Sequence, residues 1–102
     1  MHRFQKWRDA LQVAPNVDKV AGIMEDYVSA IAASASALPQ DCQEILACRP
    51  LDIQEAAVTL LHAELDFRGS HEASDFLHEV AHTFAAASVR MTLLHGTYEP
   101  AR

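Results

Sequence analysis

Residues 78–82 read His-Glu-Val-Ala-His, and their types and spacing are suited to metal chemistry. On a helix, residues four apart lie on one face, so the imidazoles of His78 and His82 can share one metal ion. The carboxylate of Glu79 is the group that would activate a metal-bound water as a general base. One interpretation of the chain is therefore a zinc-dependent hydrolase with these three residues at its site.

A catalytic zinc site needs a third protein ligand and an open coordination position. Asp75 shares the helical face of the two histidines and is the carboxylate we place with them. Besides a residue from another chain, the remaining candidates are His71, His62 and Glu64. His95 is excluded because it follows His82 by 13 residues on one predicted helix, about 20 Å along the axis.

The motif resembles that of the zincins, a class of zinc peptidases, and uncharged residues surround it here as they do in that class. The resemblance implies an edge strand that holds the substrate across the metal, and no stretch of this sequence is a strand candidate. It covers only these few residues, and a chain with six histidines matches so short a motif readily by chance. We therefore favour a protein without catalytic activity and without a cofactor, with zinc as the alternative.

The helix predicted over residues 71–95, with Ser70 as its N-cap and Gly96 as its stop, has two distinct sides. Its apolar arc comprises Phe76, Leu77, Val80, Phe84, Ala87, Met91 and Leu94. The opposite side carries His71, Asp75, His78 and His82. We therefore expect the motif histidines to face solvent, without companions that would complete a chelate.

Composition predicts an all-α fold, because half of the residues are apolar, Gly (3) and Pro (4) are scarce, and β-branched residues do not cluster. We expect residues 1–102 to form a single domain, a small up-down bundle of three to four helices. The predicted helices span residues 3–13, 17–37, 53–68 and 71–95. Asn16 caps the second, Asp52 and Glu55 form a capping box for the third, and Gly69 closes it.

The charge distribution argues against nucleic acid as a partner. Residues 1–19 carry four basic and two acidic residues, or +2, whereas the remaining 83 carry four basic and twelve acidic, or −8. An acidic body repels phosphate backbones. The sequence has neither a run of about 18 apolar residues nor the apolar core of a signal peptide, so we expect no membrane contact and a cytoplasmic location. In that compartment Cys42 and Cys48 are expected to be reduced thiols, with a mutual disulfide as the alternative.

Glu64 falls inside the apolar arc of the helix predicted over residues 53–68. Burying a carboxylate without a partner would cost several kcal/mol, so we expect either a buried ion pair with Arg68, one turn later, or a Glu64 side chain that reaches solvent at the edge of the bundle. The alternative is a polar site that joins Glu64 to His62 or Arg90.

Beyond His82, the outward side of the last predicted helix changes from charged to apolar. The residues that carry this apolar surface are Ala85, Ala86, Val89 and Leu93. A helix that is apolar all round needs a second neighbour, so we predict an interface there, either with another protein or, most simply, in a two-fold homodimer. The alternative is that the first helix covers this surface within one chain.

Taken together, these features predict a cytoplasmic helical protein that acts by protein–protein association, as an interaction or regulatory module. The zinc-dependent hydrolase, with Glu79 as general base, is the alternative.

Overall fold

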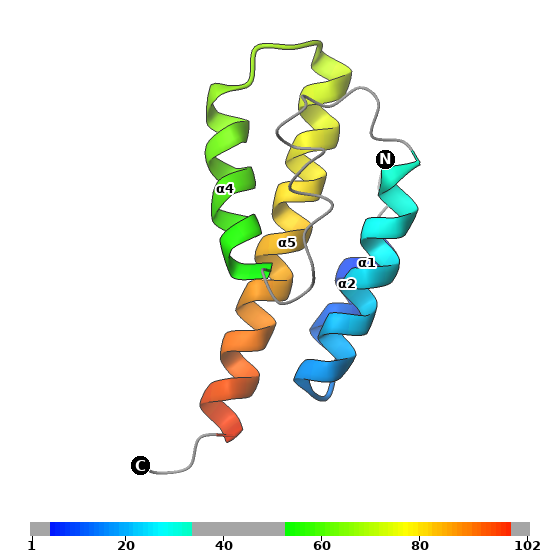
Figure 1. Ribbon diagram of the computed structural model, residues 1–102, viewed down its shortest axis with the longest axis vertical. Helices are drawn as coiled ribbons and strands as arrows, with labels where there is room; N and C mark the ends of the chain where they lie inside the picture. Colours follow the sequence, from blue (N-terminus) through cyan, green and yellow to red (C-terminus); the bar gives the residue numbers. More distant parts are fainter. Residues whose placement is uncertain (1–4, 34–52, 99–102) are drawn as a thin grey trace.

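The computed structural model describes residues 5–33 and 53–98, which form a small bundle of α-helices (Figure 1). The helices are α1 (Gln5–Gln12), α2 (Val17–Ala32), α4 (Ile53–Asp66) and α5 (His71–Tyr98). The described residues contain no strand. The predicted all-α bundle is therefore confirmed.

The longest helix, α5, is the centre of the bundle, because each of the other three helices packs against it. Helix α4 runs antiparallel along its first half and is joined to it by residues 67–70, while α1 and α2 pack on another side (Figure 1). Helix α1 runs in the direction of α5 and α2 runs opposite. None of the helices in these residues combines the length and apolar character that a membrane crossing requires.

Two of the predicted helix starts are confirmed by their caps. The Asn16 side chain accepts a hydrogen bond of 2.8 Å from the backbone N–H of Lys19. The Ser70 hydroxyl accepts one of 3.1 Å from the backbone N–H of Ala73. Each cap satisfies a backbone donor that the first turn leaves unpaired. The predicted capping residue Asp52, and both cysteines, lie outside the described residues.

The helix ends differ from the predictions. Helix α4 stops at Asp66, two residues early, and α2 stops at Ala32. Helix α5 continues through Gly96 to Tyr98, so the prediction that Gly96 stops it was wrong. Glycine inside a helix costs only about 1 kcal/mol relative to alanine, and it stops a helix mainly where the backbone turns into the left-handed region. The described glycines, Gly22 and Gly69 among them, have no positive φ.

One apolar core fills the space between the helices. Its fully buried members include Val20, Met24, Tyr27 and Ile31 of α2, Ile53 and Leu60 of α4, and Leu77, Val80 and Ala87 of α5. The Tyr27 ring packs edge-on against Trp7 at 5.8 Å and Phe84 at 6.3 Å between ring centroids. Leu65, near the end of α4, is 75% exposed and lies outside this core.

A contact from Arg90 holds the turn after α1 against α5. The Arg90 guanidinium donates two hydrogen bonds, of 3.0 and 2.7 Å, to the carbonyl oxygen of the buried Ala14. This carbonyl belongs to the chain just beyond α1, where helical carbonyls lack partners of their own. Arg90 therefore links α5 to the turn after α1. It does not pair with Glu64, as the alternative prediction had it.

Candidate functional site

Three side chains with metal-binding atoms converge where α4 meets α5. Glu64 comes from the last turns of α4, and His78 and His82 come from successive turns of α5. One ligand atom from each of the three lies within 4.8 Å of the other two. Among the described residues, no other group of three acidic, imidazole or thiol side chains converges in this way.

Packing between α4 and α5 brings these three side chains together. Leu60 lies one turn before Glu64, and Leu77 and Ala81 each directly precede a histidine; all three are fully buried. The burial of these three residues fixes which sides of α4 and α5 face the core. Near the start of α4, Gln54 donates a hydrogen bond of 3.4 Å to the Thr92 hydroxyl, as expected for an antiparallel pair in the same register.

Within the cluster, Glu64 lies close to both histidines. Its Oε2 forms a hydrogen bond with Nδ1 of His78, and its Oε1 lies 4.0 Å from Nε2 of His82. The two imidazole rings lie with their centroids 4.1 Å apart and their planes inclined by 40°. The histidine side chains are 56% and 51% exposed and that of Glu64 is 22% exposed, so solvent reaches the cluster from the histidine side.

The predicted outward orientation of the histidines agrees with their exposure, but the expectation that they lack companions was wrong. A helical wheel of α5 shows which side His78 occupies and does not show what the neighbouring helix places opposite it. Glu64 had been one of several candidates for a third ligand, and its place inside the apolar arc of α4 was the signal that it faces α5.

The other predicted partners fall elsewhere. Asp75 lies 3.5 Å from His71, with both side chains exposed, and it does not join the converging group. Arg68 is also exposed, and its guanidinium donates to the Phe67 carbonyl at 3.0 Å. The expected buried pair of Glu64 with Arg68 is therefore absent, and Glu64 pairs with His78 instead. The reason is that α4 ends at Asp66, so Arg68 lies beyond the end of the helix.

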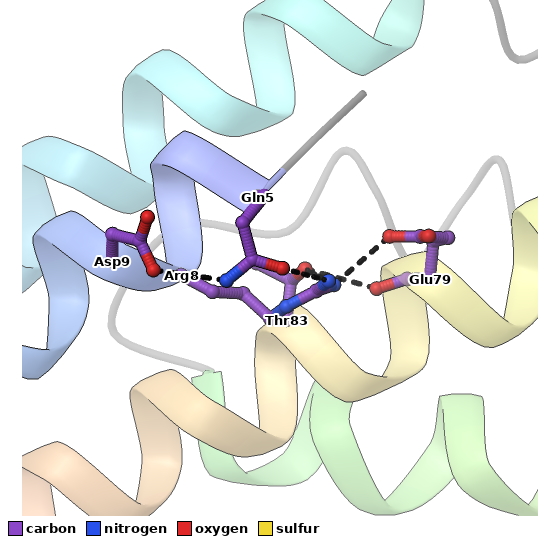
Figure 2. A network of polar contacts seen from close by, with 5 residues as sticks. All are labelled: Gln5, Arg8, Asp9, Glu79 and Thr83. Atoms are coloured by element: carbon purple, nitrogen blue, oxygen red, sulfur yellow. Dashed lines mark hydrogen bonds and ion pairs between the residues drawn. The ribbon is translucent and has the colours of Figure 1, made fainter. Parts of the chain in front are cut away.

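Glu79, the predicted general base, is directed toward α1. Its Oε1 accepts a hydrogen bond of 2.9 Å from Arg8, which also contacts the Thr83 hydroxyl at 3.5 Å (Figure 2). Gln5 accepts from the other terminal nitrogen of Arg8 at 3.0 Å and donates to Asp9 at 2.9 Å. The Glu79 carboxylate therefore faces a different neighbour from His78 and His82.

Tyr27 and Thr83 form a buried polar contact beneath the Arg8 network, which the sequence did not predict. Thr83 is fully buried, and its hydroxyl donates to the Glu79 carbonyl at 2.9 Å. Burial raises the pKa of Tyr27 well above its ordinary value, while a hydrogen bond with Thr83 lowers it, Glu79 raises it and Arg8 lowers it. The spacing of Glu79 and Thr83, one turn apart, was the available signal, but nothing in the sequence tied them to α1.

The four residues predicted as an interface line a groove on α5. Ala85, Ala86, Val89 and Leu93 border it together with Leu11 and Gln12 of α1, and its volume is about 470 Å³. Helix α1 covers part of this surface, as the alternative prediction held, and Leu11 is fully buried. Val89 and Leu93 nevertheless stay 59% and 56% exposed.

The groove and the cluster of Glu64, His78 and His82 lie along one stripe of α5, because His82 belongs to both. A scan against models of protein families, a search of curated proteins and a search of solved structures each found no match to this chain.

Proposed function

We propose that this protein acts as an interaction module and associates with a second copy of itself through the groove face, defined as Ala85, Ala86, Val89 and Leu93. The observation that supports this proposal is the exposure of the large apolar side chains of Val89 and Leu93 in the groove. Fully burying a valine or leucine side chain contributes roughly 1.5–3 kcal/mol, and association would recover part of this for two residues on each copy.

The geometry of the groove face suits a helix as its occupant. Val89 and Leu93 are one turn apart, so they project from the same side of α5. Ala85 and Ala86 bring no bulk to the surface, so a second α5 could approach to the interaxial distance of about 8–10 Å that packed helices adopt. In a two-fold dimer the same face serves both copies, so no second, different surface is needed.

Charge also favours this face over the rest of the molecule. The chain carries a net charge of −6, which repels a second copy. The four residues of the groove face are uncharged, and the neighbouring Arg90 is engaged with the Ala14 carbonyl. The residues that line the groove include no acidic side chain, so two copies that meet here do not bring acidic side chains of this surface together.

The hydrolase alternative receives less support. Its general base would be Glu79, and that carboxylate is bound by Arg8 on α1. A base must lie within hydrogen-bonding reach of the water that it activates. To reach a water held by His78 and His82, Glu79 would have to leave an ion pair whose two side chains are only 20% and 24% exposed.

Sedimentation velocity on three proteins tests the proposal. The wild-type protein is expected to sediment as a dimer at concentrations of about 100 μM, an ordinary range for a modest interface. Val89→Asp places a charge in the groove face and is expected to give a monomer. Val58→Asp is the matched control, because Val58 is a similarly exposed valine (56%) on α4, and it is expected to remain a dimer.

A wild-type protein that stays monomeric throughout the concentration range would contradict the proposal. So would equal weakening of the dimer by Val58→Asp and Val89→Asp, because the effect would then reflect added charge and not the groove face.

A further inference from the structure

We infer that Glu64, His78 and His82 form a binding site for a zinc-type divalent cation, which joins α4 to α5. The inference rests on the convergence of the three side chains and does not depend on the proposed dimer. Two imidazole nitrogens and one carboxylate oxygen are a donor set that zinc uses in proteins. Calcium and magnesium prefer oxygen ligands alone, so this set selects against both.

The distances between the three ligand atoms agree with a site that needs only a small movement of its side chains to bind an ion. Three ligands around a tetrahedral zinc ion lie about 3.3 Å from one another, given metal–ligand bonds of about 2.0 Å. The three atoms here lie within 4.8 Å of each other. Both histidines project from an exposed surface, so rotation about their side-chain bonds can supply the difference while the helices stay in place.

The hydrogen bond between His78 and Glu64 indicates how an ion would bind. It shows that an imidazole nitrogen of α5 and a carboxylate oxygen of α4 already face each other. A divalent cation bound between them would take both atoms as ligands, and the nearby Nε2 of His82 would be the third ligand. The fourth position faces solvent, where water can occupy it.

The side chains beneath the site are fully buried in the core. Glu64 and the two histidines stand directly next to Leu60, Leu77 and Ala81, whose full burial fixes the spacing of the two helices. Ligands on packed helices lose less conformational entropy on binding than ligands on loops, so the cluster is partly preorganised. The exposed pair of His71 and Asp75 lacks a third converging ligand, and it provides an internal comparison on the same helix.

Calorimetric titration of the purified, tag-free protein with Zn²⁺ tests the inference. We expect one ion per chain, no competition from a large excess of Ca²⁺, and weakening by at least about tenfold in each of His78→Ala, His82→Ala and Glu64→Gln. His71→Ala is the matched control: it removes an exposed histidine from the same helix and should leave the affinity unchanged. Far-ultraviolet circular dichroism confirms that each variant retains its helices.

Cobalt provides a second readout that reports geometry. Co²⁺ bound by two imidazoles and a carboxylate in a tetrahedral site is expected to give intense visible absorption bands, which Glu64→Gln and His78→Ala should remove. Zinc binding that His71→Ala weakens as much as His78→Ala does would overturn the inference. A wild-type affinity in Glu64→Gln, or the absence of a saturable Zn²⁺ site, would also overturn it.

Discussion

Glu64 of α4 and His78 of α5, fourteen residues apart in the chain, form a hydrogen bond across the antiparallel helix pair. The contact lies at the surface, directly above the buried Leu60 and Leu77. Because of this contact, His78, which a helical wheel assigns to solvent, belongs to a cluster with Glu64 and His82. The same stripe of α5 then continues from His82 into the groove face.

Removing this contact should have little effect on the metal-free protein. The His78 side chain is more than half exposed, so His78→Ala should change the free energy of unfolding by less than about 1 kcal/mol. Saturation with Zn²⁺ at about 100 times the wild-type dissociation constant should add about 2.7 kcal/mol to the wild-type protein and at most about 1.4 kcal/mol to the variant, whose affinity is expected to be at least tenfold weaker. Urea unfolding with and without Zn²⁺ measures both effects. A large metal-free loss would mean that the cluster is mainly structural.

Arg8 should be important for holding α1 against α5. Arg8→Ala leaves the partly buried Glu79 carboxylate without its partner and is expected to cost about 1–3 kcal/mol. Because Trp7 packs on Tyr27 next to this contact, its fluorescence should shift toward that of an exposed indole. Gln12→Ala, at an exposed position in the same helix, is the control and should change stability by less than about 0.5 kcal/mol. Equal effects of the two substitutions would contradict the assigned role.

Leu60 and Leu65 of α4 should respond very differently to truncation. Leu60 is fully buried between α4 and α5, so Leu60→Ala is expected to cost about 2–5 kcal/mol. Leu65 is exposed, and Leu65→Ala should cost less than about 0.5 kcal/mol. Urea unfolding followed by circular dichroism compares the two. Similar losses would show that α4 packs with another side toward α5.

Tyr27 should make the protein less stable at alkaline pH. Its pKa is raised in the folded state, so an unfolded chain loses the phenolic proton first, above about pH 10. The contribution to stability is full below that pH and is lost as pH rises toward the folded pKa, at up to about 1.4 kcal/mol per pH unit. Tyr27→Phe removes this component, and the difference between the two slopes of unfolding free energy against pH measures it. Identical slopes would contradict the burial of the hydroxyl.

The fold follows from local patterns that are visible in the amino-acid sequence. The apolar composition with few Gly and Pro residues and the caps at Asn16 and Ser70 each specify helices without reference to distant residues. The outward orientation of His78 likewise follows from the spacing of residues within one helix. These features could therefore be predicted from the sequence alone.

The composition of the site could not be predicted, because it depends on how separate helices are placed. Glu64 was expected to pair with Arg68 one turn later, but the packing of Leu60 against α5 brings it to His78 instead. Glu79 was expected beside the histidines, but the short α1 supplies Arg8 to it. A pattern within one helix gives the direction of a side chain, and its partner depends on the register between helices.

Contacts between copies of the chain test the central proposal most directly. A one-to-one mixture of isotope-labelled and unlabelled protein, studied at high concentration by isotope-filtered nuclear magnetic resonance, reports only contacts between molecules. The account predicts intermolecular cross-peaks from the methyl groups of Val89 and Leu93, and none from Val58 on α4. Cross-peaks from Val58 alone, or no intermolecular cross-peaks at any concentration, would contradict it.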